Sequence, residues 1–206
     1  SYRRSDALVR EVVDSEAMTE SGRIQEGSIE RRKTDHLELC ASGQVDFRRK
    51  TTLLEQVQLV HDCLPELHFD DVSIATEVLG KQLKAPLFIS AMTGGTAEAG
   101  NINRELARVA EELGIGFGLG SQRPMISRPE DAASYRVRDV APNALVLGNL
   151  GLVQARQMPT SAVADLVGAV GADALCLHLN PAMELVQPGG DRDFSGGLET
   201  IERLCG

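Results

Sequence analysis

Short apolar runs alternate with amphipathic segments through the second half of the chain. Four runs, at residues 86–90, 115–119, 145–148 and 174–178, are rich in apolar residues and glycine. Bounded by Gly, Asn or Pro, they are too short for buried helices and are typical of strands. Their centres are 29, 29 and 30 residues apart. The pattern therefore predicts four strands in a regular repeat.

Each predicted strand is followed by a segment with apolar residues at helical spacing. The first segment has Ile102, Leu106, Val109 and Leu113 along one side. The four segments cover residues 101–113, 129–140, 160–170 and 198–204. A strand followed by a helix, four times over, predicts a parallel sheet, because strands buried on both faces read as continuous apolar runs.

Two architectures are built from such units, and the first turn separates them. A doubly wound nucleotide-binding sheet usually carries Gly-x-Gly-x-x-Gly there, whereas this turn reads Met92-Thr93-Gly94-Gly95-Thr96. Polar residues follow every predicted strand, as in a barrel. We therefore expect an α/β fold, a (β/α)8 TIM barrel of which residues 85–206 form the first half, truncated before the fifth strand. A half would expose sheet edges and an apolar interior, so we expect the intact polypeptide to be longer.

The residues before the repeat divide into two parts. Residues 1–30 mix charges, Ser and Gly and predict a flexible N-terminal arm. Residues 31–84 predict a segment that packs on the barrel and contributes a clamp for the substrate. Within it, the apolar spacing over residues 53–60 favours a helix, and the alternation over residues 69–74 favours a strand.

Glycines alternate along the second predicted strand, at positions 114, 116, 118 and 120. At a period of two, one face of this strand has no side chains. The bare face would admit a flat or bulky ligand, or it would relieve crowding inside the barrel. The spacing favours neither alternative over the other.

Composition and charge exclude several classes of protein. Lys and Arg total 21 against 30 Asp and Glu, a formal charge of −9, which argues against a general nucleic-acid binder. No apolar run approaches the roughly 18 residues of a membrane helix, and no signal core is present at the start. We expect a soluble, cytoplasmic protein. The 4 cysteines form no C-x-x-C pair, so we expect reduced, mostly buried thiols without a disulfide or zinc site.

Four motifs carry candidate chemistry. The run Arg31-Arg32-Lys33-Thr34-Asp35-His36 concentrates cations suited to a diphosphate, although such runs are more often solvated surface. Met92-Thr93-Gly94-Gly95 offers unobstructed backbone N–H groups, or simply forms a tight turn.

The other two motifs follow the second and fourth strands. Gly120-Ser121-Gln122-Arg123 supplies a hydroxyl, an amide and a guanidinium that suit an anion or a cofactor edge, or are ordinary surface polarity. His178-x-Asn180-x-x-x-Glu184 adds a carboxylate suited to Mg²⁺ shared with a phosphate, or a solvated idle one. In Gly189–Phe194, Asp191 and Arg192 are interpreted as fixing the loop.

Taken in order, these motifs resemble type 2 isopentenyl-diphosphate isomerase. The resemblance runs from about Arg31 to the last residue and rests on an ordered series of segments: Arg32-Lys33-x-Asp35-His36, Thr51-Thr52-Leu53-Leu54, Leu64-Pro65-Glu66-Leu67, Met92-Thr93-Gly94-Gly95, Gly120-Ser121-Gln122-Arg123 and His178-Leu179-Asn180 through Gly190-Asp191-Arg192-Asp193-Phe194. It implies a flavin-dependent (β/α)8 barrel that interconverts isopentenyl diphosphate and dimethylallyl diphosphate. The implied cofactors are FMN kept reduced by NADPH, and Mg²⁺ on the diphosphate. A homo-oligomer, tetramer or octamer, is also implied.

The resemblance implies roles for individual residues. Substrate binding falls to Arg32, Lys33, His36, Ser121, Gln122, Arg123, Asn180 and Met183. FMN contacts fall to Ala91, Met92, Thr93, Ser121 and Asn149, and the Mg²⁺ ligand is Glu184. Protein groups able to add and remove protons are scarce here, so the reduced flavin is expected to act as acid and base, and no catalytic side chain is assigned.

One position departs from the family pattern. The family usually has Gln immediately before the metal-binding Glu, and this chain has Met183. Met neither relays a proton nor donates a strong hydrogen bond. Either a neighbour such as Gln187 takes the polar role, or the reaction relies wholly on the flavin, or activity is reduced. We expect the second.

Two other functions remain open at this point. The first is an FMN-dependent barrel oxidoreductase of the type that oxidises 2-hydroxy acids, which would need a histidine base from later strands and leaves the basic run unexplained. The second is an inactive half-barrel that acts only in assembly.

Overall fold

A computed structural model describes residues 35, 37–43, 45, 47, 49–187 and 189–206. The predictions made for the arm at residues 1–30 and for Arg32, Lys33 and His36 lie outside the described residues.

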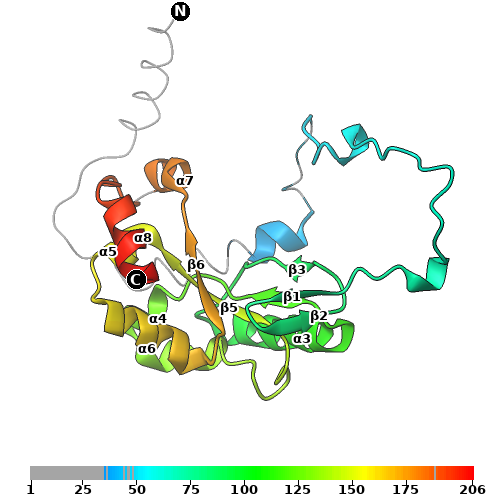
Figure 1. Ribbon diagram of the computed structural model, residues 1–206. Helices are drawn as coiled ribbons and strands as arrows, with labels where there is room; N and C mark the ends of the chain where they lie inside the picture. The colour runs from blue at the N-terminus through cyan, green and yellow to red at the C-terminus, as the bar shows by residue number, and fades with distance from the viewer. Residues whose placement is uncertain (1–34, 36, 44, 46, 48, 188) are drawn as a thin grey trace, which may run out of the picture.

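The centre of the fold is a parallel sheet of four strands (Figure 1). The strands are β3 (Phe88–Ile89), β4 (Gly116–Gly118), β5 (Val146–Gly151) and β6 (Ala174–His178), hydrogen-bonded in that order. In their register Phe88 lies opposite Gly116, Phe117 opposite Val146 and Leu147 opposite Ala174. All four predicted strands are confirmed, since each apolar run overlaps one of these strands. β4 and β5 are largely buried, whereas Phe88 of β3 and Cys176 of β6 are exposed.

Helices follow the strands. They are α3 (Ala97–Leu113), α4 (Pro124–Ser127), the 3₁₀ helix η3 (Pro129–Ser134), α5 (Leu152–Arg156), α6 (Thr160–Val170), α7 (Pro181–Val186) and α8 (Gly197–Cys205). The Thr96 hydroxyl accepts from the Ala99 N–H at 3.1 Å and starts α3, and Gly114, at φ 66°, ends it in the left-handed region. The helices predicted at residues 101–113, 160–170 and 198–204 are confirmed.

The helix predicted over residues 129–140 is wrong. Only Pro129–Ser134 is helical, in the tighter 3₁₀ form, and turns follow. Tyr135, Val137 and Ala141 are all drawn into the core. Their spacing of two and four residues would not place all three on one narrow helix face, so the chain turns to bury them.

The main helices pack against the same side of the sheet. Phe117 and Val146 share a core with Ala107 and Ala110 of α3, and Leu150 packs with Val163 of α6. Strand order follows the chain without the reversal of a doubly wound sheet. The parallel α/β arrangement is confirmed, while its closure into eight strands remains a prediction.

Charged contacts secure the amino ends of the strands. A hairpin of β1 (Thr76–Val78) and β2 (Lys81–Leu83) lies there, and the Lys81 ammonium is 3.6 Å from the Asp173 carboxylate, which precedes β6. Glu111 accepts from the Asn143 and Ala144 N–H groups at 3.0 and 2.7 Å, ahead of β5. The opposite, carboxyl edge of the sheet is free of this hairpin and is where the predicted site residues lie.

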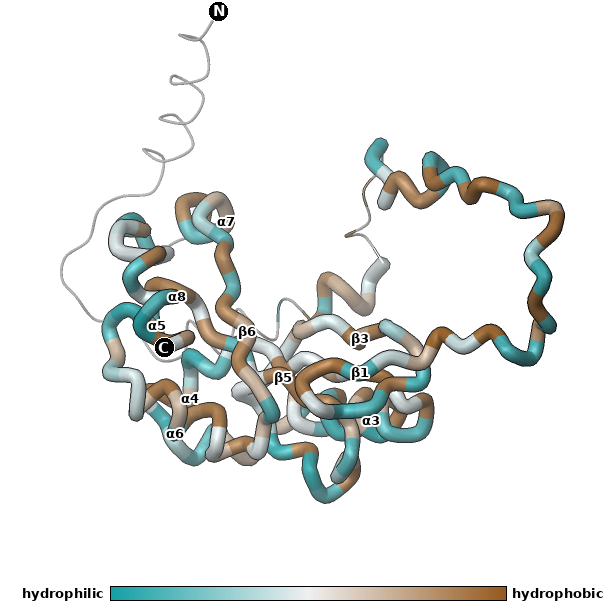
Figure 2. The backbone as a smooth tube through the Cα atoms, in the orientation of Figure 1, coloured by the Kyte–Doolittle hydropathy of each residue, from teal (hydrophilic) through white to brown (hydrophobic). Residues whose placement is uncertain are grey.

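The segment between residues 50 and 75 stands away from the sheet as an extended arc (Figure 2). It contains two 3₁₀ turns, η1 (Leu54–Gln56) and η2 (Phe69–Asp71). Leu59 is 89 % and Val60 98 % exposed. The predicted helix at residues 53–60 and strand at residues 69–74 are wrong, because an apolar pattern forms neither element without a surface to bury it.

The prediction of mostly buried thiols is also wrong. Cys40, Cys63, Cys176 and Cys205 are all exposed and free. Cys176 lies on β6, whose neighbours Leu175 and Leu177 pack on the helical side. The Cys176 side chain therefore faces the other side, which no described helix covers. None of the helices in the described ranges is long and apolar enough to cross a membrane.

The glycine-lined face of β4 is filled by the chain itself. A methyl group on Gly116 would meet the Phe88 ring, one on Gly118 would lie 3.0 Å from the Ala91 nitrogen, and one on Gly120 would meet the Thr93 backbone. Of the two alternatives for these glycines, the structure shows relief of crowding. The same approach brings the Thr93 segment to the end of β4, where Gly120 N–H donates to the Thr93 carbonyl at 3.1 Å.

We expect Gly120→Ala to destabilise the fold by about 1–3 kcal/mol, because the added methyl meets backbone that has little freedom to move. Gly168→Ala, in α6 with nothing within 4 Å of the new methyl, is the control. It should stabilise by about 0.5–1 kcal/mol through helix propensity. Urea unfolding of both variants measures the difference. Equal effects of the two substitutions would contradict the steric argument.

Candidate functional site

A pocket of about 350 Å³ opens at the carboxyl edge of the sheet. Eight of the ten predicted site residues that the structure describes line it: Ala91, Met92, Ser121, Arg123, Asn149, Asn180, Met183 and Glu184. They come from the segments that follow β3, β4 and β6 and from β5 itself. Gly120, Gln154, His178 and Gln187 complete the lining. Residues that are far apart in the chain converge here because parallel strands end at one edge.

The other two predicted residues, Thr93 and Gln122, do not line the pocket. Thr93 is 5 % and Gln122 1 % exposed. The Thr93 carbonyl accepts from Gly120 N–H and from the side-chain amide of Asn103, at 3.1 and 3.2 Å. Thr93 and Gln122 stand directly behind the pocket wall, and their assigned contacts remain predictions.

Buried polar side chains hold the backbone of the pocket wall. Asn103 donates to the carbonyls of Thr93 and Ser134, at 3.2 and 3.0 Å. The Tyr135 hydroxyl donates to the Ser121 carbonyl at 2.7 Å, and burial raises the pKa of Tyr135 well above its usual value, so it stays a donor. Its ring occupies the space where Gly94 has no side chain.

Gln122 likewise holds the backbone of Asn149 through hydrogen bonds. Gln122 N–H donates to the Asn149 carbonyl at 2.7 Å, and the Gln122 side-chain oxygen accepts from Asn149 N–H at 3.1 Å. The Gln122 side-chain nitrogen donates to the Leu166 carbonyl of α6 at 2.8 Å. Gly148 is required beside it, since a methyl group there would lie 2.6 Å from the Gln122 oxygen.

His178 is the imidazole of the pocket wall. Its Nδ1 lies 2.9 Å from Oδ1 of Asn149. Burial lowers the pKa of His178 below its usual value; the Glu184 carboxylate acts in the opposite direction and the Arg123 guanidinium adds to the lowering. The ring is therefore neutral at pH 7.

Polar contacts to one loop tie the charged groups of the wall together. Asp191 N–H donates to Glu184 Oε2 at 3.0 Å, and the Asp191 carboxylate accepts from the Gln154 amide at 2.6 Å. The Arg123 guanidinium is 3.7 Å from the same carboxylate. The interpretation of Asp191 as a residue that fixes the loop is supported by these three contacts.

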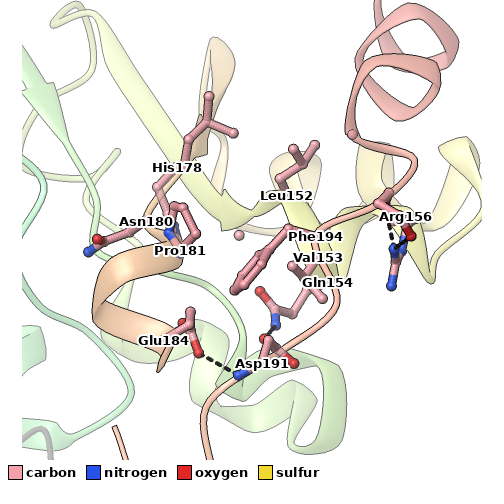
Figure 3. A pocket seen from close by; sticks show the side chains of 14 residues that line it. Leu152, Val153, Gln154, Arg156, His178, Asn180, Pro181, Glu184, Asp191 and Phe194 are labelled. Carbon is pink, nitrogen blue, oxygen red and sulfur yellow. Dashed lines mark hydrogen bonds between the residues drawn. The ribbon is translucent and has the colours of Figure 1, made fainter. Parts of the chain in front are cut away.

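A second, mostly apolar pocket of about 150 Å³ adjoins the first (Figure 3). Phe194 points into it beside Leu152 and Val153. The loop that carries Phe194 is also held by an ion pair, in which Arg156 Nη2 lies 2.9 Å from Asp193 Oδ2. The wall shared by the two pockets consists of Gln154, His178, Asn180 and Glu184.

The metal-ligand set is sparse. Over the described ranges, three or more His, Cys, Asp or Glu side chains nowhere gather into a group that could hold a metal ion. Glu184 supplies one carboxylate to the pocket wall. A divalent ion there would need most of its oxygen ligands from a bound phosphate and water.

Gln154 is the pocket residue that sequence reasoning missed. It lies in α5, a short helix directly after β5, and no periodicity or spacing distinguishes it. Its position three residues after a strand end was the available signal. His178 was noticed in its motif, but no role at the site was assigned to it.

The fold and the pocket define a parallel α/β protein with an amide- and cation-lined site at the carboxyl edge of its sheet. Residues 26–181 match the family model of FMN-dependent dehydrogenases. The chain belongs to this family.

Three relatives illustrate the similarity, each an isopentenyl-diphosphate delta-isomerase. The protein of Methanococcoides burtonii is 46 % identical over 179 residues, covering 86 % of this chain and 49 % of the relative. That of Mycolicibacterium vanbaalenii is 44 % identical, covering 86 % and 51 %. That of a Synechococcus species is 46 % identical, covering 87 % and 52 %. The chain thus spans about half the length of these relatives, and the resemblance drawn from the motifs is confirmed.

We expect acid to destabilise the protein partly through His178. Its pKa is lower in the folded state than the unfolded value of about 6.5, so the unfolded chain binds more protons below that pH. The contribution of the neutral His178 ring to the free energy of unfolding is fully present above about pH 6.5. It declines as the pH falls towards the pKa of the folded state. In His178→Gln this decline should be smaller, measured as the urea midpoint at several pH values.

The exposed His61 provides the control. His61→Gln should follow the wild-type pH profile. Identical profiles for wild type and His178→Gln would show that His178 is not the group responsible.

Proposed function

We propose that the protein acts in the interconversion of isopentenyl diphosphate and dimethylallyl diphosphate. The observation that carries the proposal is the convergence of eight predicted site residues on one pocket. The names of the relatives support it too, since their similarity covers 86 % and 87 % of this chain. The basic pair Arg32-Lys33 would add further cations for the diphosphate.

Arg123 and Glu184 suit the two parts of a magnesium diphosphate. The Arg123 guanidinium binds phosphate oxygens through paired N–H donors. Glu184 would contribute one carboxylate oxygen to Mg²⁺, and the diphosphate itself would contribute others. Arg123 already contacts the Asp191 carboxylate, and an incoming phosphate would offer it anionic oxygens of the same kind.

The donor set of the pocket suits FMN. Ala91 and Met92 offer an apolar wall, while Ser121, Asn149 and Gln154 offer a hydroxyl and two amides at the same opening. Its volume of about 350 Å³ lies within the usual range for ligand sites. Ala91, Met92, Ser121 and Asn149 would hold the cofactor, with Thr93 behind them. Gly116 and Gly118 of β4 take no part, because Phe88 and Ala91 already fill the space beside them.

The side chains of the wall orient substrate more than they transfer protons. Besides Arg123, the titratable groups lining the pocket are His178 and Glu184. Glu184 is assigned to Mg²⁺, which leaves one neutral imidazole for a reaction that adds one proton and removes another. Reduced FMN, when bound, would supply the remaining acid–base chemistry, with NADPH keeping it reduced. Arg123 and Mg²⁺ would hold the diphosphate in place while positive charge develops nearby.

A direct assay tests the proposal. The purified chain is first examined for a flavin spectrum with added FMN, then supplied with NADPH, Mg²⁺ and isopentenyl diphosphate. We expect dimethylallyl diphosphate to form, and Glu184→Gln to require a higher Mg²⁺ concentration than the control Glu199→Gln. Flavin binding with net substrate oxidation would support a hydroxy-acid oxidase instead. The absence of both flavin binding and turnover would contradict the proposal.

Substitution of Met183 tests whether the flavin or a polar side chain carries out the proton transfers. The Met183 side chain lines the pocket and is 45 % exposed, so a longer polar group is accommodated without repacking. If the flavin carries the proton transfers, Met183→Gln should change the isomerisation rate by less than tenfold. Met183→Leu is the apolar control. A gain well above tenfold for Gln alone would show that a polar group is required at this position.

A further inference from the structure

Gln122 is one of the largest fully buried side chains, with 1 % of its surface exposed. Both ends of its amide are hydrogen-bonded within the protein. The nitrogen donates to the Leu166 carbonyl at 2.8 Å and to the Met125 sulfur at 3.5 Å, and the oxygen accepts from Asn149 N–H at 3.1 Å. Because only the amide nitrogen can donate to the Leu166 carbonyl, the amide oxygen must be the end that faces Asn149.

Both backbone polar groups of Asn149 are bonded to Gln122. The Gln122 N–H donates to the Asn149 carbonyl at 2.7 Å, while the Gln122 side chain receives the Asn149 N–H. Asn149 itself is 8 % exposed and lines the pocket. The buried Gln122 thus fixes the position of the Asn149 backbone within β5.

The chain of contacts continues to His178. Oδ1 of Asn149 lies 2.9 Å from Nδ1 of His178. An amide oxygen only accepts, so a neutral ring bonded to it carries its proton on Nδ1. Nε2 is then left as an acceptor in the wall shared by the two pockets.

We infer that Gln122 is a positioning residue of the site: by holding the backbone of Asn149 it fixes the amide that selects the Nδ1–H tautomer of His178. The consequence for flavin and substrate rests on the proposed function, whereas the hydrogen-bond chain does not. This role is indirect, in contrast to a contact between Gln122 and the substrate.

The test uses nuclear magnetic resonance of the protein labelled at its 4 histidines, with the His178 signals assigned from His178→Gln. Long-range nitrogen–proton correlations distinguish the two tautomers of a neutral ring. In the wild type we expect the Nδ1–H form. In Gln122→Met, which keeps the volume but loses the acceptor for Asn149 N–H, we expect a mixture that contains the Nε2–H form.

Two matched variants separate positioning from packing. Met125→Leu removes only the sulfur acceptor and leaves the Asn149 bonds, so it should retain the Nδ1–H form. Gln122→Glu should retain it as well, because a buried carboxyl that is protonated donates to Leu166 and still accepts from Asn149. If Gln122→Met does not fold, Gln122→Asn, whose amide is one methylene too short, replaces it with the same expectation.

The tautomer of His178 is measured in the protein without any ligand. An Nε2–H ring in the wild type, or an unchanged Nδ1–H ring in Gln122→Met and Gln122→Asn, would overturn the inference. A change of tautomer in Met125→Leu equal to that in Gln122→Met would show that packing, not the Asn149 bond, is responsible. Failure of the isomerase assay leaves these measurements unaffected.

Discussion

The site depends on how backbone polar groups are hydrogen-bonded beyond the ends of the strands. Past the last ladder bond, N–H and C=O groups that remain buried still need partners, since leaving one without a partner costs about 1–3 kcal/mol. Three buried side chains from outside the sheet meet this need: Asn103 at Thr93, Tyr135 at Ser121 and Gln122 at Asn149. Each supports a position predicted to contact the flavin. The pocket is therefore shaped by residues that do not line it.

The two edges of the sheet use polar groups differently. At the amino edge, Glu111 and Asp173 are engaged with the backbone ahead of β5 and with Arg138 and Lys81, so their charges serve stability. At the carboxyl edge, Arg123 and Glu184 meet only through the Asp191 loop and remain on a pocket wall. This division between stabilising and functional edges is the one expected of parallel βα proteins.

The sequence was informative where one physical effect dominated. Short apolar runs predicted strands β3 to β6, and regular apolar spacing predicted the long helix α3, although its first turn, residues 97–100, was not included. Residues 53–60 carry a helical pattern too, but a pattern records only what a segment could bury, and Val60 has nothing to bury it here. At the site, motif order identified the wall, whereas Gln154 and the inward orientation of Gln122 depend on tertiary contacts with α5 and α6. Local spacing contains no information about those contacts.

The order of the strands has a consequence for how the chain acquires its structure. Each strand from β4 onward pairs with the strand immediately before it, and the intervening loops close over 29 to 30 residues each time. The entropic cost of adding each of these described strands is therefore nearly constant, and none of the pairings among the four waits for a distant part of the chain. The sheet can grow one βα unit at a time from its first strand, in step with synthesis from the N-terminus.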